Sequence, residues 1–309
     1  VSEQIANALR KNSARVLDLF RSWDADGDGE VTRAEFHKAM PALGLEVPKK
    51  DIDELFDEWD KGGGRRFTAD ELLRVGSRRG KPVLVRLALE RGADIHASDQ
   101  RGETAAHMAA EEGNPECLKL LLEAGIDKDV RDTRENGMGM TVLETAALYG
   151  HADCVKVLLE AGADVDLGNM ENGWTPLYRA ASKGDSVCLK LLLEAGADID
   201  KADKAGHTPF WEAAYSGHAD CLKLLLEAGV CKETPSKHYG WAPLHAAAKQ
   251  THPACVKLLL EAGVDTSVRD HEGRTALDLA QEYAREFDGW FGERYAEVIA
   301  MLAAAGSGS

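Results

Sequence analysis

A motif of about 33 residues recurs through most of the chain and constrains its fold more than any other feature. The copies align by the residue that opens each of them, at spacings of 37, 34, 33, 34 and 33 residues. A period in this range is typical of solenoids, in which a repeat buries its apolar face only against its neighbours. The opening residues are Thr104, Thr141, Thr175, Thr208, Ala242 and Thr275.

Each repeat reads as two short helices. Threonine at the opening position caps the free backbone N–H groups of a helix start. Gly150, Gly184 and Gly217 stand where the first helix should end in a left-handed residue. The second helix has a leucine stripe, as in "CLKLLLEAG", and a further glycine closes it. The pattern therefore predicts an all-α stack of helix pairs.

The "TPL" start and the "LLLEAGAD" end resemble the ankyrin repeat family over roughly residues 71–305. The resemblance implies an α-solenoid of about seven repeats with short turn or hairpin tips, which binds protein partners. In the other repeats the glycine of "GAD" lies 21 residues after the opening position. Counting back from Gly92 places the opening of the first repeat near Glu71. Residues 306–309 then form a tail, and both chain ends are compatible with cuts from a longer protein.

Five cysteines lie thirteen residues after an opening position and form a ladder through the repeats. Neighbouring repeats stack about 10 Å apart, too far for a disulfide between them. A zinc site needs clustered ligands, whereas this ladder has one cysteine per layer. We expect small buried thiols in a reducing, cytoplasmic protein. Only Cys231 breaks the pattern; the ladder is Cys117, Cys154, Cys188, Cys221 and Cys255.

Residues 24–35, "DADGDGEVTRAE", resemble the calcium loop of the EF-hand family, with Gly29 at the sharp turn. Calcium takes six to eight oxygen ligands in a flexible cage, and this loop supplies such a set. The resemblance implies side-chain oxygens at positions 1, 3 and 5, a backbone carbonyl at 7, a hydroxyl or water at 9 and a bidentate carboxylate at 12. The expected ligands of one Ca²⁺ are Asp24, Asp26, Asp28, Glu30, Thr32 and Glu35.

A second loop, "DKGGGRRFTADE", occupies residues 60–71 and is degenerate. It keeps Asp60 and Glu71 at the first and last positions, but glycines replace the acidic ligands at positions 3 and 5. Two arginines, Arg65 and Arg66, add positive charge. We expect weak calcium binding or none here, and we interpret residues 1–75 as an EF-hand pair with one working loop.

The two modules overlap in the sequence. Residues 71–79 are expected to be both the helix that leaves the second loop and the first helix of the first repeat. Such an overlap leaves no flexible linker, so calcium at the first loop would act on a rigid body.

The partner-binding face of ankyrin repeats is formed by the turn tips and the outer side of the first helices. Reading those positions from the third repeat onward returns many Met, Tyr, Trp and His residues, which are enriched at interface centres. The alternative is that some rings pack between neighbouring tips. Trp211 stands where the family usually has a structural histidine, so we assign it to packing. The predicted groove is Met138, Met140, Tyr149, Trp174, His207, Tyr215, Tyr239 and Trp241.

The formal net charge of −16 disfavours nucleic acid and anionic membranes as partners. We find no apolar run long enough to span a bilayer and no enzymatic motif. The leading hypothesis is a monomeric, calcium-responsive adaptor that binds a protein or peptide on its repeats. One alternative is a constitutive scaffold in which calcium is a structural staple. Another is the regulatory segment of a larger enzyme or channel.

Overall fold

The computed structural model describes residues 32–39, 68–133, 138–286 and 290–306. These residues are helical apart from turns and two isolated β-bridges, Ser98 with Thr104 and Arg131 with Thr141. The chain divides into an N-terminal part, Val1–Ile126, and a C-terminal part, Asp127–Ser309. Among the helices described, none is both long and apolar enough to cross a membrane.

The first helix of the first repeat begins earlier than we predict. We place its opening near Glu71, whereas the helix starts at Ala69 with Thr68 as its N-cap. The reason is a capping box: the hydroxyl of Thr68 accepts the N–H of Glu71, and the Glu71 carboxylate accepts the N–H of Thr68. The helices of the N-terminal part are α3 (Arg33–Ala39), α5 (Ala69–Arg78), α6 (Pro82–Glu90), α7 (Ala105–Glu111) and α8 (Pro115–Glu123).

Helix α5 packs as the first helix of a repeat. It lies against α6 and α7, and Leu73 and Val85 are buried between the helices. Gly76 permits the close approach, because a Cβ there would meet the Cβ of Leu84 at 2.9 Å. The side chain of Asp70 accepts the backbone N–H of Asp94, which ties the start of α5 to the end of its repeat.

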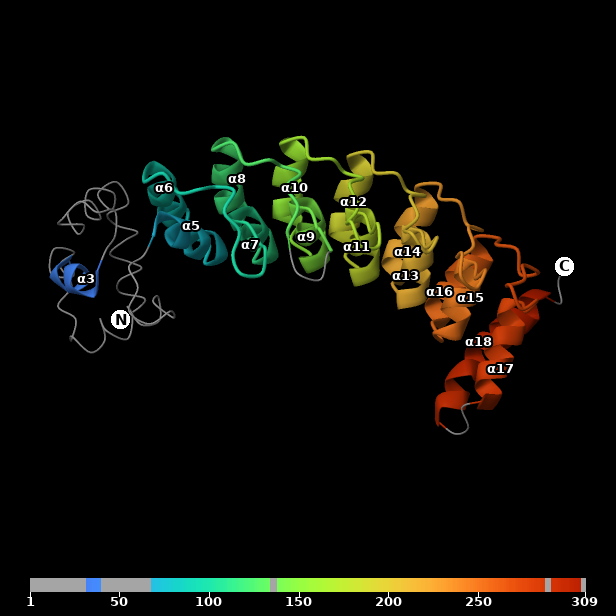
Figure 1. The fold of residues 1–309 in the computed structure, drawn as a ribbon. Coiled ribbons are helices and arrows are strands. Elements are labelled where there is room, and N and C mark those ends of the chain that lie inside the picture. Colours follow the sequence, from blue (N-terminus) through green and yellow to red (C-terminus); the bar gives the residue numbers. More distant parts are fainter. Residues whose placement is uncertain (1–31, 40–67, 134–137, 287–289, 307–309) are drawn as a thin grey trace. The chain divides into compact units, whose positions relative to one another are not determined.

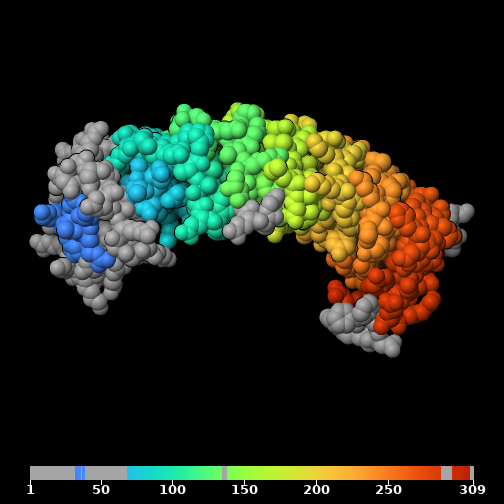
Figure 2. Space-filling view, in the orientation of Figure 1, coloured from blue at the N-terminus to red at the C-terminus, as the bar shows by residue number. Residues whose placement is uncertain are grey.

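The C-terminal part has two layers of helices, visible in Figure 1. Each first helix packs on the first helix of the next repeat, and each second helix packs likewise on the next second helix. In Figure 2 its repeats follow one another as bands from green to red. The first helices are α9 (Val142–Tyr149), α11 (Pro176–Lys183), α13 (Pro209–Ser216), α15 (Pro243–Lys249) and α17 (Ala276–Glu286). The second helices are α10 (Ala152–Glu160), α12 (Ser186–Glu194), α14 (Ala219–Glu227), α16 (Pro253–Glu261) and α18 (Trp290–Gly306).

The predicted helix ends are confirmed in this part of the chain. The hydroxyl of Thr141 accepts the N–H of Glu144, and Thr175 and Thr208 cap their helices in the same way. Gly150, Gly184 and Gly217 adopt left-handed conformations, with φ of 75°, 73° and 80°. In the following repeat the same register position is Thr251, which is left-handed at φ 54° without being glycine.

The cysteine ladder is buried, as predicted. Its five thiols are free and buried, with exposed fractions of at most 1%. Burial raises the pKa of Cys117 and Cys255 to about 11 and that of Cys188 and Cys221 to about 12. Cys231 is exposed.

Candidate functional site

The third position after the opening residue links neighbouring repeats of the C-terminal part. Nε2 of His245 lies 3.0 Å from the carbonyl oxygen of Arg274 in the next repeat. One repeat earlier, the indole N–H of Trp211 donates to the carbonyl of Trp241 at 2.8 Å. Trp211 therefore replaces the structural histidine, and our packing assignment for it is confirmed.

The same position holds an acidic residue in the third repeat. Glu144 is fully buried, and its Oε1 accepts Nε of Arg179 at 2.9 Å and Nδ2 of Asn169 at 3.0 Å. Burial raises the pKa of Glu144 to about 7, although Arg179 and Asn169 favour the ionised form. The result is a buried ion pair that joins two consecutive repeats.

In the fourth repeat the position is Tyr178, and it makes a second buried link. Its hydroxyl donates to Oε2 of Glu212 at 2.6 Å. The other oxygen of Glu212 accepts the hydroxyls of Ser182 and Ser216 at 3.1 and 2.8 Å. We did not predict these links from the sequence. The replacement of the usual histidine by Glu, Tyr and Trp in three consecutive repeats was the available signal.

Two of the predicted groove residues, Trp174 and His207, have their polar atoms in contact with Asp203. Trp174 stacks on Tyr178, with ring centroids 5.5 Å apart, and its N–H donates to Asp203 at 3.0 Å. The ring of His207 stacks on Trp211 at 3.9 Å and also contacts Asp203. Burial alone would raise the pKa of Asp203, but hydrogen bonds from His207 and Trp174 hold it below its usual range.

Met140 and Trp241 do not belong to an open groove, which corrects our prediction for them. Their exposed fractions are 1% and 4%. Met140 is buried beside the guanidinium of Arg179, whose Nη2 lies 3.9 Å from its sulfur. Trp241 is covered by the ring of Tyr239 at 4.7 Å and by the ammonium of Lys249 at 4.6 Å. Both side chains therefore pack inside the stack of repeats.

The remaining predicted residues reach the surface to different degrees. Tyr149 and Tyr239 are 44% and 47% exposed. Met138 and Tyr215 are half-buried. Met170, at a hairpin tip, is 64% exposed, and we did not single it out from the sequence.

Backbone hydrogen bonds connect the hairpin tips of adjacent repeats. The N–H of Met170 donates to the carbonyl of Met138 at 2.8 Å, and that of Lys204 donates to Asn172 at 2.9 Å. The N–H of Lys237 donates to the carbonyl of Ala205 at 2.8 Å. The tips are therefore held in register, which presents their side chains as one surface.

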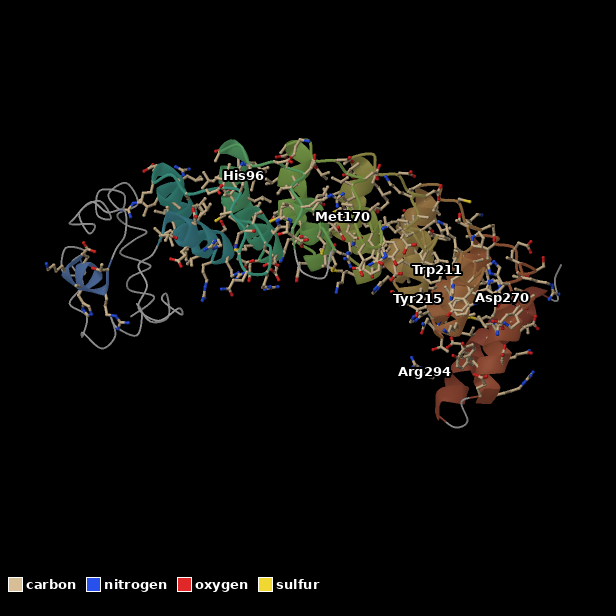
Figure 3. The ribbon with its side chains drawn as sticks, viewed as in Figure 1. His96, Met170, Trp211, Tyr215, Asp270 and Arg294 are labelled. Atoms are coloured by element: carbon tan, nitrogen blue, oxygen red, sulfur yellow. The ribbon has the colours of Figure 1, made fainter. Side chains whose placement is uncertain are left out.

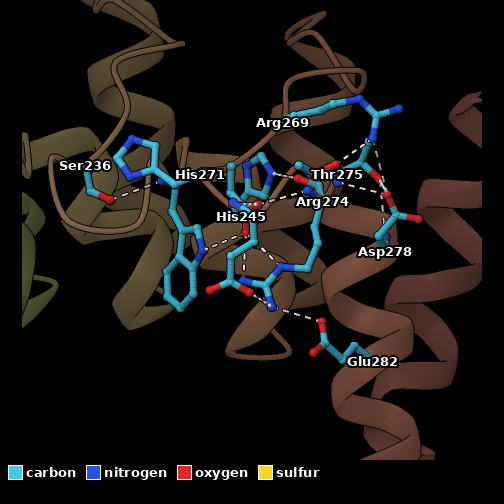
Figure 4. A network of polar contacts seen from close by, with 12 residues as sticks. Ser236, His245, Arg269, His271, Arg274, Thr275, Asp278 and Glu282 are labelled. Carbon is cyan, nitrogen blue, oxygen red and sulfur yellow. Dashed lines mark hydrogen bonds and ion pairs between the residues drawn. The ribbon is translucent and has the colours of Figure 1, made fainter.

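Arg274 organises the polar contacts between the sixth and seventh repeats, as Figure 4 shows. Its guanidinium makes two hydrogen bonds to Asp270, at 2.8 and 2.9 Å. The same group pairs with Glu282 at 2.9 Å and Glu272 at 2.8 Å. Burial would raise the pKa of Asp270, but the contacts with Arg274 lower it overall.

Of the predicted calcium ligands, the structure describes Thr32 and Glu35. The Thr32 hydroxyl and Oε2 of Glu35 are 2.7 Å apart, and Glu35 caps the start of α3. Glu71 of the second loop makes the same kind of cap on α5. In the described part of the chain, no three His, Cys, Asp or Glu residues are grouped to hold a metal ion. The other predicted positions, Asp24, Asp26, Asp28, Glu30 and Asp60, lie outside the described residues.

Comparison with known proteins identifies the family of the repeats. A model of the family "Ankyrin repeats (3 copies)" matches residues 73–169, 166–235 and 228–303. The crystal structure of the human ASB11 ankyrin repeat domain superposes with a TM-score of 0.62 at 27% identity. That superposition covers 75% of this chain and 96% of the ASB11 domain.

Two curated relatives from Arabidopsis thaliana match shorter stretches. One is the ADP-ribosylation factor GTPase-activating protein AGD2, 40% identical over 73 residues, or 24% of this chain and 9% of AGD2. The other is the probable calcium-binding protein CML25, 25% identical over 128 residues, or 38% of this chain and 68% of CML25. This chain thus corresponds to only a small portion of AGD2.

The family match, which begins at residue 73 and ends at residue 303, agrees with the two layers of helices and the inter-repeat links described above. The chain belongs to the ankyrin repeat family and is a protein-interaction module.

Proposed function

We propose that this chain is a calcium-responsive adaptor: one calcium ion at residues 24–35 biases the partner binding of the repeats. The observation that carries the proposal is the cap that Glu71 makes on α5. In the sequence Glu71 is the last position of the second calcium-type loop, and in the structure it is the third residue of the first helix of a repeat. We infer from this position of Glu71 that the two modules share α5.

The donor set of the first loop supports a calcium site. Thr32 and Glu35 bring two hard oxygen ligands to within 2.7 Å of each other. Together with the three aspartates and the carbonyl of Glu30, they would hold the ion. The relative CML25 bears the name of a probable calcium-binding protein, which also supports the proposal. When the free calcium concentration is 100 times the dissociation constant, binding stabilises the calcium-bound form by about 2.7 kcal/mol. This is enough to shift a two-state equilibrium.

The chain provides matched variants for testing the site. A capping box accepts glutamine as well as glutamate, so Glu35→Gln and Glu71→Gln both preserve their helix starts. We expect calorimetry on calcium-stripped protein to find one site. Glu35→Gln should abolish it, because a bidentate carboxylate is lost, and Glu71→Gln should leave the stoichiometry unchanged. Two sites, or equal effects of the two variants, would contradict this part of the proposal.

Calcium responsiveness needs its own experiment. Small-angle X-ray scattering with and without calcium, at matched ionic strength, should show a shift in the distance distribution that Glu35→Gln removes. Superimposable curves, with calorimetry showing one bound ion, would instead support a constitutive scaffold in which calcium only stabilises the N-terminal part.

A further inference from the structure

A cluster of aromatic rings lies on the first-helix layer of the C-terminal part. We call Trp211, Tyr215, Trp241 and Tyr283 the ring cluster, because the two tryptophans are buried together and the two tyrosines pack against them. Trp211 and Tyr215 are neighbours along α13, as Figure 3 shows, with ring centroids 5.0 Å apart. The half-buried tyrosines make the outer side of the cluster reachable from solvent.

Lys249 places an ammonium group on the ring cluster. Its Nζ lies 4.6 Å from the ring centroid of Trp241 and 5.3 Å from that of Tyr283. Such contacts hold the lysine in place over the rings. Burial, and then the charge of Arg274, lower the pKa of Lys249. The ammonium is therefore partly desolvated and fixed in position.

The carboxylates around Arg274 already form ion pairs with its guanidinium. Asp270, Glu272 and Glu282 all pair with Arg274. No carboxylate of the described residues forms an ion pair with Lys249 within 4.0 Å. The N–H donors of this ammonium thus lack an anionic partner among the residues that the structure describes.

Further lysines extend this positive character along the repeats. Lys204 and Lys237 are exposed at successive hairpin tips, and their ammonium groups reach only carbonyl oxygens of the tip before. Lys183 is exposed at the end of α11. On the second-helix layer, in contrast, lysines are matched by glutamates one turn later, as in Lys257 with Glu261. The chain carries a net charge of −16, yet Lys183, Lys204 and Lys237 take part in none of the ion pairs found among the described residues.

We propose that the ring cluster and Lys249 bind an acidic peptide segment of a partner protein. A carboxylate of that segment pairs with Lys249, and an adjacent apolar side chain packs on Tyr215 and Tyr283. Neighbouring acidic residues meet Lys204 and Lys237. The inference rests on the protein-interaction part of the proposed function and does not depend on calcium.

The test begins with selection from a random peptide library. A segment of about 12 residues in extended form spans roughly 40 Å, enough to cross four repeats about 10 Å apart. We expect the selected peptides to be enriched in Asp and Glu next to an aromatic residue or leucine. Their affinity should fall as salt rises from 0.1 to 1 M, where the Debye length shrinks from about 10 to about 3 Å. Selection of basic or uncharged peptides would overturn the inference.

Variants then locate the site. Lys249→Ala should weaken binding of a selected peptide by about tenfold or more, because a partly buried charge pair is broken. Lys249→Arg should stay within about threefold of the wild type, since arginine keeps both the charge and the contact with the rings. Lys257→Ala on the second-helix layer is the control and should bind normally. Equal affinities for wild type and Lys249→Ala, with both proteins folded by circular dichroism, would overturn the inference.

Two further experiments test other anionic ligands and the effect of calcium. If a single-stranded oligonucleotide or phosphatidylserine vesicles bind through Lys249 while no acidic peptide is selected, the inference fails. Peptide affinity is measured in EGTA and in calcium. Dependence on Lys249 in both conditions, with no effect of calcium, would support the inference while contradicting the calcium-responsive part of the proposed function.

Discussion

Nε of Arg179 donates to Oε1 of Glu144 across 2.9 Å, and these two charged side chains come from the opening turns of consecutive first helices. Both are buried, with side-chain exposed fractions of 9% and 0%. The pair joins α9 to α11 inside the stack, so it specifies how one repeat sits on the next.

Removing one partner should be costlier than removing both. At pH 8, where Glu144 is ionised, Arg179→Ala should lower the free energy of unfolding by about 3–5 kcal/mol, because it leaves a buried charge without compensation. The double variant Glu144→Leu with Arg179→Met should recover most of that loss, since apolar side chains of similar volume tolerate burial. Urea denaturation measures both values. If the double variant is as unstable as Arg179→Ala, the loss of stability does not come from the buried charge of Glu144.

The raised pKa of Glu144 predicts a particular pH dependence. The native state holds this proton more tightly than the unfolded chain, so the contribution favours folding at low pH. It is lost as the pH rises from the ordinary value of 4.5 through about 7. The stability difference between wild type and Glu144→Gln should fall across that window, by at most about 1.4 kcal/mol per pH unit, and stay flat above it. A difference that grows with pH would show that Arg179 outweighs burial.

Thr251 offers a stabilising substitution. It adopts φ of 54° at the register position where Gly150, Gly184 and Gly217 stand in other repeats. A left-handed backbone costs a residue with a Cβ about 1–2 kcal/mol. Glycine avoids this strain, but it loses more backbone entropy on folding, so the net gain is smaller than the strain. Thr251→Gly should therefore raise the free energy of unfolding by up to about 1 kcal/mol. The reverse change, Gly217→Ala, should lower it, and a loss of stability in Thr251→Gly would refute the strain.

The six cysteines should react in two classes with an aromatic disulfide reagent. Cys231 is exposed, whereas the ladder thiols are buried and four of them have raised pKa values. Since the thiolate is the reactive species, one thiol should react in the native protein and six after denaturation. Cys231→Ser should remove the native reaction, and Cys117→Ser should leave it intact. Rapid labelling of several thiols would mean that the stack opens readily.

The helix pairs were predictable because their signals are local. Threonine caps, the glycines at Gly150, Gly184 and Gly217, and the leucine stripes act within a few residues, so repetition reveals them in one chain. The count from Gly92 predicts a helix from Glu71, two residues after the observed start of α5 at Ala69, because it does not include the capping box of Thr68 and Glu71. Local chemistry there outweighed the repeat register.

The candidate groove was predictable only in part. The opening positions correctly place Tyr149 and Tyr239 at the surface, but the same rule also selects Met140 and Trp241, which are buried. Exposure at these positions depends on which side chains cover them in the folded stack. Arg179 of the next repeat covers Met140, whereas Tyr239 and Lys249 of the same repeat cover Trp241.

The sequence by itself determined the family of the fold, the direction of each helix and the buried ladder of cysteines, because these follow from capping, glycine geometry and apolar periodicity. A calcium loop at residues 24–35 stays a prediction from the sequence. Only the tertiary structure decided how the aromatic and charged residues pair. Tyr178 with Glu212, Glu144 with Arg179, and Lys249 with the ring of Tyr283 are contacts across repeats, and they form because stacking brings together residues that are separate in the unfolded chain.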